Sequence, residues 1–270
     1  ELAAGDSVRL DVFAMPHDPL RAHGIAFREV TYRAQLGETP AWLIEGDRDT
    51  WLVHVHGKGS EPGEGLLMLP AAVKLGMPVL AIQYRNDADA PSIDGDRYHY
   101  GATEWADLEA AVQYALDEGA RDVIVAAHSM GGGIALSFLE RSPLAERVSA
   151  LILDAPMLEL RRTIDLGIRE SALPAGLAGP LRTLTGWRAG IDFNAVDYLS
   201  RAGELRVPVL LFHGDEDDII PVELSREFAA ARPDLVTYIE APGLGHTQAW
   251  NGDPEAYERA VSEFLADRLQ

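Results

Sequence analysis

The stretch VIVAAHSMGGG, residues 123–133, decides the fold of this chain. A run of β-branched and small apolar residues stops at His128-Ser129, and three glycines follow Met130. The first part is typical of a buried strand, and MGGGIALSFLERS, residues 130–142, predicts a helix that ends before Pro143. The sequence therefore puts Ser129 on a tight corner between a strand and a helix, where its hydroxyl would project above the end of a sheet.

The same alternation of strands and helices continues on both sides of that corner. Strands are predicted at 24–34, 40–46, 50–57, 77–84, 121–127, 147–156, 205–214 and 235–242. Helices are predicted at 63–76, 101–120, 130–142, 222–231 and 254–269. Continuous apolar strands separated by helices predict an α/β fold, with a mostly parallel eight-stranded sheet covered on both faces. The first strands follow one another without helices, so we expect that edge of the sheet to be antiparallel.

One segment, residues 157–204, falls outside this alternation. It is rich in leucine and is broken by glycine and proline, as in SALPAGLAGPLRTLTGW. We expect one domain over residues 1–270, with 157–204 inserted as a short helical lid over the carboxyl ends of the strands. Packing helices without a gating role remain the alternative.

Composition excludes several classes of protein. The 43 acidic residues outnumber the 23 basic residues and give a formal net charge of −20 over 270 residues, which disfavours binding to nucleic acid or to an anionic membrane. Without cysteine the chain has no disulfide, no thiolate metal site and no cysteine nucleophile. The chain starts at Glu1 rather than Met, which is consistent with the removal of a leader or anchor, so the sequence fixes no compartment.

Two neighbours of Ser129 decide how well the corner suits a nucleophile. The residues two positions before and after such a serine must be small, as in the pattern G-x-S-x-G. Gly131 stands at the second of these positions, but Ala127 stands where the pattern has glycine. Because the extra methyl group weakens the match, the case for chemistry depends on partners elsewhere in the chain.

A candidate base and a candidate acid both follow later strands. His246 lies in APGLGHTQAW, residues 241–250, a glycine-rich loop after the last predicted strand. The stretch LLFHGDEDDIIP, residues 210–221, ends a buried strand in an acidic cluster that consists of Asp215, Glu216, Asp217 and Asp218. Serine, then acid, then histidine is the chain order of a triad built on a nucleophile elbow. The sequence therefore predicts Ser129 as nucleophile and His246 as general base, oriented by an acid of this cluster.

An oxyanion-binding loop is predicted in HVHGKGS, residues 54–60. Gly57 and Gly59 allow the backbone to turn its N–H groups inward. The backbone N–H groups of Lys58 and Met130 would then bracket the carbonyl oxygen of a substrate. His56 and Gly57 are candidate substrate contacts in the same loop.

These motifs together resemble those of the α/β-hydrolases. The resemblance rests on AHSMGG (127–132), HGDEDDIIP (213–221), LGH (244–246) and HGKGS (56–60), and it extends over about residues 24–269. The chain is most similar to the compact serine esterases of the Bem46 type, with a short lid after the sixth strand. The family pattern HGxxDxxVP implies Asp217 as the triad acid, since Ile220-Pro221 align with its closing Val-Pro. Alanine at the position of Ala127 also occurs in some small bacterial lipases.

The resemblance implies a serine hydrolase that cleaves carboxylic esters through an acyl-enzyme, without a cofactor. The apolar residues of the expected lid favour a small-molecule ester with an apolar acyl or aryl group, and the candidate contacts are Leu173, Leu177, Leu181, Leu184 and Trp187. Thioester or amide hydrolysis on the same triad is an alternative, and a slow or non-catalytic binding protein with this fold is another. The sequence fixes neither the natural substrate nor the oligomeric state.

Other residues leave alternatives open. Asp154, at the end of ALILDAP, is a second candidate for the triad acid. His54 and His56 form an H-x-H pair on one predicted strand, so a metal site on that face is conceivable. The further ligands would come from His99, His213 and Asp215.

Two more side chains near the predicted site have both a functional and a plain structural interpretation. Lys58 would either attract an acidic substrate group or point to solvent. Trp250 would either wall the substrate pocket or pack against the core.

Overall fold

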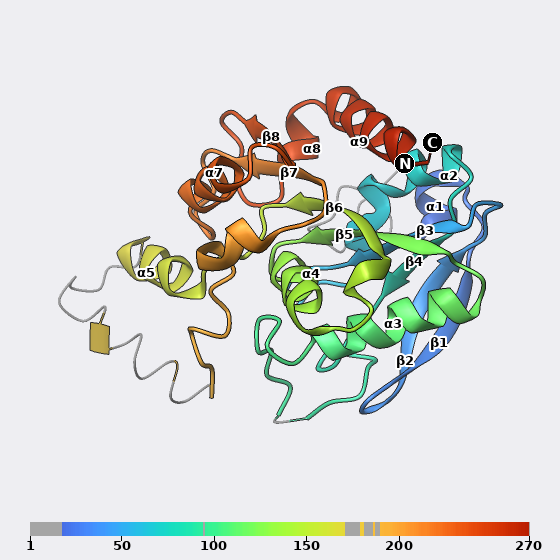
Figure 1. The fold of residues 1–270 in the computed structure, drawn as a ribbon, viewed down its shortest axis with the longest axis horizontal. Helices are drawn as coiled ribbons and strands as arrows, with labels where there is room; N and C mark the ends of the chain where they lie inside the picture. Colours follow the sequence, from blue (N-terminus) through green and yellow to red (C-terminus); the bar gives the residue numbers. More distant parts are fainter. Residues whose placement is uncertain (1–17, 94, 171–178, 181–185, 187–189, 270) are drawn as a thin grey trace, which may run out of the picture.

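Eight strands form one sheet in the order β1-β2-β4-β3-β5-β6-β7-β8 (Figure 1). The computed structural model describes residues 18–93, 95–170, 179–180, 186 and 190–269. The strands are β1 (Arg28–Ala34), β2 (Gly37–Ile44), β3 (Thr50–Val55), β4 (Val79–Ile82), β5 (Asp122–His128), β6 (Val148–Asp154), β7 (Val209–Gly214) and β8 (Val236–Ala241). Strand β2 pairs antiparallel with β1 and with β4, and every other pairing is parallel. The predicted fold class and its antiparallel edge are confirmed.

Helices cover both faces of this sheet (Figure 1). The α-helices are α1 (Pro19–His23), α2 (Leu69–Lys74), α3 (Trp105–Asp117), α4 (Met130–Arg141), α5 (Leu160–Glu170), α7 (Val222–Ala231), α8 (Ala249–Gly252) and α9 (Pro254–Arg268). Short 3-10 helices are η1 (Pro62–Leu67), η2 (Ala145–Arg147) and η4 (Leu199–Glu204). Helices α3, α4 and α7 pack on one face, and α2, α8 and α9 pack on the other.

The central strands are buried on both faces, which explains their continuous apolar sequence. In β5, Val123 and Val125 enter the core beneath α3 and α4, whereas Ile124 enters the core beneath α2 and α9. All three side chains are fully buried. Because alternate residues of each strand supply two separate cores, the strand positions and the serine at the end of β5 are held rigidly.

Two predicted helices differ in extent from the sequence expectation. The helix expected at 63–76 is divided into η1 and α2 at Met68, and Pro70 stands in the first turn of α2, where a missing N–H costs nothing. The helix expected at 101–120 begins only at Trp105. The carboxylate of Glu104 instead accepts the N–H groups of His99 and Gly101, which fixes a turn before the helix.

Residues 157–204, which the sequence predicts as a lid, follow β6 and precede β7. Helix α5 is joined to α7 by an ion pair of 2.8 Å between Arg162 and Glu227, and a bridge between Glu159 and Asp197 connects the two ends of this segment. The candidate substrate contacts of the expected lid lie outside the described residues, namely Leu173, Leu177, Leu181, Leu184 and Trp187. Within the described part of the chain, no helix is long and apolar enough to cross a membrane.

Candidate active site

Ser129 lies on the corner between β5 and α4 with a strained backbone. Its φ of 50° and ψ of −119° are unusual for a residue with a side chain, and such a conformation costs about 1–3 kcal/mol. The end of β6 and the segment that follows it hold the corner on both sides, because the Ser129 N–H donates to Asp154 O at 2.9 Å and the Ser129 carbonyl accepts from Met157 N at 2.9 Å. The strain is therefore fixed by the sheet and presents the hydroxyl at its carboxyl edge.

The glycine after the serine is required by a close approach of backbone. A Cβ atom on Gly131 would lie 2.4 Å from the carbonyl oxygen of Val55 and 2.7 Å from that of His56. Ala127, two residues before the serine, is fully buried in the core. The corner thus accommodates one methyl group where the motif usually has glycine.

His246 connects this serine to an acidic side chain. Its Nε2 lies 2.9 Å from Ser129 Oγ, and its Nδ1 lies 2.7 Å from Asp217 Oδ2. Because a carboxylate oxygen only accepts, Nδ1 carries the proton and Nε2 is free to accept from the serine hydroxyl. The tautomer of His246 is therefore the one that a general base for Ser129 needs.

Contacts between the loops after β7 and β8 bring these two side chains together. The N–H of Gly243 donates to Asp215 Oδ1 at 2.6 Å, and the N–H of Glu216 donates to Leu244 O at 3.0 Å. A Cβ atom on Gly214 would lie only 2.1 Å from Leu244 O, so glycine is needed where the loops touch. Two members of the acidic cluster therefore have structural contacts: Asp215 binds the loop after β8, and Asp217 binds His246.

Four donors hold the carboxylate of Asp217 in its ionised form. Oδ1 accepts the N–H groups of Ile219 and Ile220, both at 2.8 Å, and Oδ2 accepts from His246 and from His213. Burial alone would raise the pKa of Asp217, but the hydrogen bonds from His213, His246 and Ile220 outweigh it and lower that pKa well below its ordinary range.

His213 is a contact that the sequence analysis missed in this role. Its Nε2 lies 3.0 Å from Asp217 Oδ2, and its Nδ1 lies 2.6 Å from the hydroxyl of Ser225 on α7. The side chain is fully buried. From the sequence, His213 was expected only as a possible metal ligand, although its place four residues before the acid was the available signal.

The candidate oxyanion donors lie beside the serine. Met130 is the first residue of α4, so its N–H is one of the unpaired donors at the positive end of a helix. In the described part of the chain, no protein acceptor is assigned to the backbone N–H of Lys58 or of Met130. The Lys58 side chain is exposed, and its Nζ approaches the hydroxyl of Tyr100 at 3.2 Å.

Glu64 is a second residue that the sequence analysis missed. Its Oε2 accepts the N–H of Gly57 at 2.6 Å. A Cβ atom on Gly57 would lie 3.1 Å from Ser129 Cβ and 3.4 Å from Glu64 Oε2. Gly57 therefore lies close against the serine, and a Cβ atom there would crowd Ser129.

The structure corrects the expected role of His56 as a substrate contact. The side chain is fully buried, with Nε2 at 2.9 Å from Asp87 Oδ2 and Nδ1 at 2.7 Å from the carbonyl oxygen of Gly57. Both ring nitrogens are thus occupied by protein groups. His56 therefore supports the loop from below and does not face a ligand.

His54 and His56, the pair on which the metal alternative rested, contact different partners. His56 follows the end of β3 and stacks on Tyr84, whereas the Nε2 of His54 contacts His128 Nδ1 at 3.1 Å on the other side of the sheet. Burial is the main cause that lowers the pKa of His54 well below 6.5, so this ring is neutral. Across residues 18–93, 95–170, 179–180, 186 and 190–269, no group of three histidine or carboxylate side chains could hold a metal ion.

Asp154 is not placed to orient His246. Its Oδ2 is 3.3 Å from the hydroxyl of Tyr257, and the side chain is buried beneath α9. Burial raises the pKa of Asp154 to about 7, although the charge of His246 opposes the rise. Because His246 Nδ1 already donates to Asp217, the geometry does not support Asp154 as the triad acid.

Trp250 packs against the core, which was the structural alternative to a place in the wall of the substrate pocket. Its ring packs against the core beneath α9, and its indole N–H donates to Glu258 of that helix at 3.4 Å. These contacts stabilise the short helix α8 after the His246 loop. They do not direct the indole toward Ser129.

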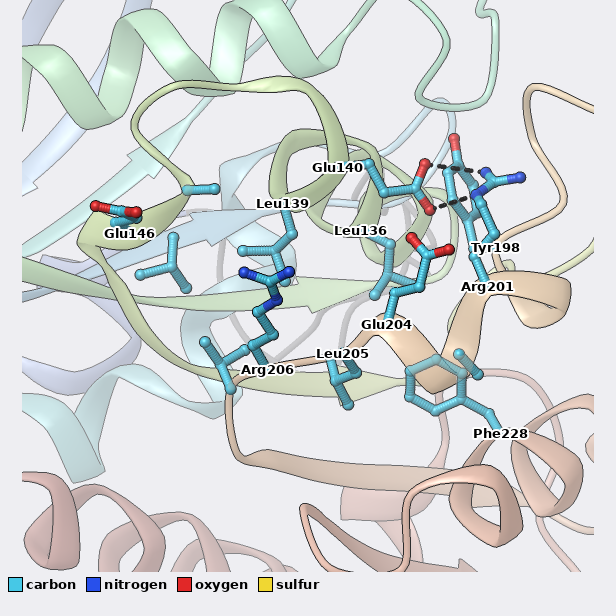
Figure 2. A pocket seen from close by; sticks show the side chains of 14 residues that line it. Leu136, Leu139, Glu140, Glu146, Tyr198, Arg201, Glu204, Leu205, Arg206 and Phe228 are labelled. Atoms are coloured by element: carbon cyan, nitrogen blue, oxygen red, sulfur yellow. Dashed lines mark hydrogen bonds and ion pairs between the residues drawn. The ribbon is translucent and has the colours of Figure 1, made fainter.

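A separate cavity of about 610 Å³ lies between α4, η4 and α7 (Figure 2). Leu136 and Phe228 form part of an apolar floor, and Figure 2 shows Glu140 and Arg201 pointing toward one another at one side, where they form an ion pair of 2.8 Å. Val148, the first residue of β6, also lines it. The cavity is therefore near the amino ends of the strands, whereas the serine corner follows the carboxyl end of β5.

The sheet order, the helices on both faces and the serine on a strained corner after β5 define an α/β-hydrolase. A family model described as serine aminopeptidase, S33, matches residues 47–187, which is more than half of the chain, and the chain belongs to this family. A Mycobacterium tuberculosis protein named only as uncharacterized is 26% identical over 72% of this chain. A second Mycobacterium tuberculosis protein, from another strain, matches to the same extent. The chain spans only about three fifths of the length of these two relatives, since the match covers 61% of each.

Solved structures with this fold include hydrolases of different specificity. An esterase of Pyrococcus furiosus is similar with a TM-score of 0.75 and 20% identity, and the match covers 97% of each chain. A puromycin-hydrolyzing peptidase of Mycobacterium tuberculosis is similar with a TM-score of 0.68 and 19% identity over 90% of this chain and 39% of that chain. Identities at this level show the shared fold and leave the substrate open.

Proposed function

We propose that this protein is a serine hydrolase that cleaves carboxylic esters through an acyl-enzyme. The observation that carries the proposal is the hydrogen-bonded series Ser129 Oγ, His246 Nε2 and Nδ1, and Asp217 Oδ2, with distances of 2.9 and 2.7 Å. A serine, a histidine in the correct tautomer and an ionised carboxylate are the parts of an acyl-transfer site. The esterase of Pyrococcus furiosus that shares the fold supports an ester as the first substrate class to test.

In the first half of the reaction, Ser129 Oγ attacks the ester carbonyl while His246 Nε2 takes the serine proton. Asp217 keeps the imidazole oriented and stabilises the imidazolium that forms. The developing oxyanion accepts from the backbone N–H groups of Lys58 and Met130. His246 then donates its proton to the leaving alcohol, and the acyl group remains on Ser129.

In the second half, water replaces the alcohol. His246 takes a proton from the water as it attacks the acyl-enzyme, and the same oxyanion donors stabilise the second tetrahedral intermediate. His246 finally returns the proton to Ser129 Oγ, and the carboxylic acid leaves. Every proton moves between the substrate, water and these side chains, so the proposed reaction requires no cofactor.

The substrate and the lid belong to the same proposal. We take residues 157–204 as a lid of a single domain, because the segment leaves the sheet at the carboxyl end of β6, the edge that carries Ser129. Its leucine-rich sequence suits a small-molecule ester with an apolar acyl or aryl group.

Amide hydrolysis is a second candidate, because the family model is described as that of a serine aminopeptidase. The same three side chains would cleave an amide, with His246 protonating the amine that leaves. The test is a comparison of kcat/KM on p-nitrophenyl esters from acetate to palmitate, on aminoacyl p-nitroanilides and on acyl thioesters. Faster turnover of esters supports the proposal, whereas turnover of anilides or thioesters alone overturns its substrate class. A burst of nitrophenol without steady turnover would instead indicate a slow hydrolase that acts as a binding protein.

A further inference from the structure

A buried charged pair lies directly beneath the loop that carries Lys58. The side chains of His56 and Asp87 are 0% and 4% exposed, and His56 Nε2 lies 2.9 Å from Asp87 Oδ2. His56 Nδ1 lies 2.7 Å from the carbonyl oxygen of Gly57. A carboxylate and a carbonyl oxygen both lack a hydrogen, so both ring nitrogens must donate. His56 is therefore an imidazolium that bridges Asp87 and the Gly57 carbonyl.

The surroundings favour this charge state. Asp87 also accepts the N–H of Tyr84 at 2.7 Å and the hydroxyl of Tyr98 at 2.8 Å, which fixes both of its oxygens. Burial lowers the pKa of His56, but the hydrogen bond and the charge of Asp87, with smaller help from the Gly57 carbonyl and Glu64, raise it above 6.5 in total. The other titratable groups near the ring are His54 on β3 and His128 on β5, and both are held neutral by burial.

A second donor acts on the same carbonyl. The ring of Tyr84 stacks on His56 with a centroid distance of 4.4 Å, and its hydroxyl lies 3.0 Å from the carbonyl oxygen of His56 and 3.1 Å from that of Gly57. The backbone N–H of Ser60 also donates to the Gly57 carbonyl, at 3.2 Å. The N–H of Gly57 is meanwhile held by Glu64 at 2.6 Å. The backbone of Gly57 is thus fixed at its N–H and at its C=O.

The hydrogen bonds to the Gly57 carbonyl also set the orientation of the Lys58 N–H, because both groups belong to one peptide unit. The Gly57 carbonyl and the Lys58 N–H belong to the same planar trans peptide, and in such a unit the C=O and N–H point in opposite directions. Donors that hold the carbonyl on the buried side therefore turn the Lys58 N–H away from the core. Ser129 lies beside this loop, since a Cβ atom on Gly57 would be 3.1 Å from Ser129 Cβ.

We propose that His56, Asp87 and Tyr84 are positioning residues that aim the Lys58 N–H at the substrate oxyanion through the Gly57 carbonyl. This inference rests on the proposed function, because it assigns a role within the same acyl-transfer site. An oxyanion donor acts mainly in the transition state, so a misdirected Lys58 N–H lowers kcat and leaves KM nearly unchanged. Loss of a whole oxyanion donor costs about 10²–10³-fold in rate, and misdirection costs up to that amount.

The charge on His56 gives the proposal a signature in pH. Because its pKa is raised, the imidazolium persists above pH 6.5 and is lost as the pH rises further through the raised value. Above that value a neutral ring has one proton for two acceptors, so the hold on the Gly57 carbonyl weakens and kcat falls. Removing the charge of Asp87 lowers the pKa of His56, so this alkaline fall moves to lower pH.

The experiment measures kcat, KM and their pH dependence on a p-nitrophenyl ester for wild type, Asp87→Asn and Tyr84→Phe. The matched control is Asp107→Asn on α3, which removes the charge from another buried pair, with 2.6 Å between Asp107 Oδ2 and Nε of Arg85, two residues before Asp87. A trifluoromethyl ketone inhibitor is measured in parallel, because its adduct with serine carries the same oxyanion.

The expected result is a fall in kcat of about tenfold or more for Asp87→Asn with KM within about twofold, and an alkaline limb at lower pH. The inhibition constant of the trifluoromethyl ketone rises by the same factor as kcat/KM falls. Tyr84→Phe, which removes only one donor, gives a smaller fall of the same kind and tests the proposal if Asp87→Asn does not fold. Asp107→Asn lowers the melting temperature but leaves kcat within about twofold.

Unchanged kcat and pH profile in folded Asp87→Asn and Tyr84→Phe would overturn the proposal, as would an equal loss of kcat in Asp107→Asn. These outcomes differ from a failure of the proposed function. If wild type has no hydrolase activity, or Ser129→Ala is as active as wild type, the acyl-transfer site itself is refuted.

Discussion

Replacing the buried acid Asp154 by asparagine should stabilise the protein in a way that depends on pH. Its side chain is 1% exposed, and its closest assigned polar partner is the hydroxyl of Tyr257 at 3.3 Å. Burial raises the pKa of Asp154 from 3.8 to about 7. Asparagine has the same shape and no charge, so it keeps the acceptor for Tyr257 and removes the titration.

The sign and size follow from the difference between the folded and unfolded states. Between about pH 4 and pH 7 the folded chain keeps the proton on Asp154 while the unfolded chain has lost it, so the free energy of unfolding falls as the pH rises. A change of one in pKa corresponds to about 1.4 kcal/mol, which gives about 4 kcal/mol in total. About 3 kcal/mol of this loss in the free energy of unfolding occurs between pH 5 and pH 8.

Thermal unfolding followed by circular dichroism at pH 5 and pH 8 measures the effect. Relative to wild type, the melting temperature of Asp154→Asn should rise by on the order of 10 °C more at pH 8 than at pH 5. Asp217→Asn is measured for comparison, since the lowered pKa of Asp217 keeps its own carboxylate ionised at both pH values. If Asp154→Asn gives the same difference from wild type at both pH values, Asp154 is ionised in the folded state and the reasoning fails.

Three further changes test other parts of the site. Asp217→Asn should lower kcat by about 10⁴-fold because His246 loses its tautomer, whereas Asp154→Asn should keep nearly full ester turnover. His213→Phe should lower kcat with little change in KM, and should destabilise the fold by about 1–3 kcal/mol, because Asp217 and a buried hydroxyl each lose a partner. Gly131→Ala should lower the free energy of unfolding by at least about 1–3 kcal/mol in urea denaturation, since its Cβ would lie 2.4 Å from a carbonyl oxygen.

For each of these variants, one result would contradict the expected outcome. Equal rates for Asp217→Asn and wild type would remove Asp217 from the mechanism, and a loss of rate in Asp154→Asn would give that role to Asp154. A rise in KM without a fall in kcat would show that His213 acts on substrate binding. Unchanged stability in Gly131→Ala would mean that α4 can move away from β3.

The sheet could be predicted because its central strands are buried on both faces, which leaves continuous apolar runs in the sequence. The helix α3 could be predicted from apolar residues at helical spacing, and Leu108, Ala111, Val112 and Ala115 are all fully buried. Its start could not, because Glu104 ends the preceding turn through hydrogen bonds to the backbone of His99 and Gly101. Such contacts depend on the path of the loop and leave no periodic signal.

The candidate site also has residues that local motifs indicate and residues that they do not. The sequence indicated Ser129, Asp217 and His246 because each follows a predicted strand within a short motif, and the structure brings these three side chains into contact. The partners His56 and Asp87 are 31 positions apart, and nothing in either local stretch indicates that they pair. His56 lies beyond the end of β3, so the alternation that suggested an H-x-H metal face no longer applies to its side chain.

The most direct test of the account is the rate of ester hydrolysis by Ser129→Ala beside wild type. Both proteins are assayed on the p-nitrophenyl ester that wild type cleaves best, with equal folding checked by circular dichroism. The account predicts that wild type turns over and that the variant loses about 10⁴–10⁶-fold in kcat, because the acyl-enzyme has no nucleophile on which to form. Equal turnover by the folded variant would contradict the account, since the strained corner at Ser129 would then have no part in the chemistry.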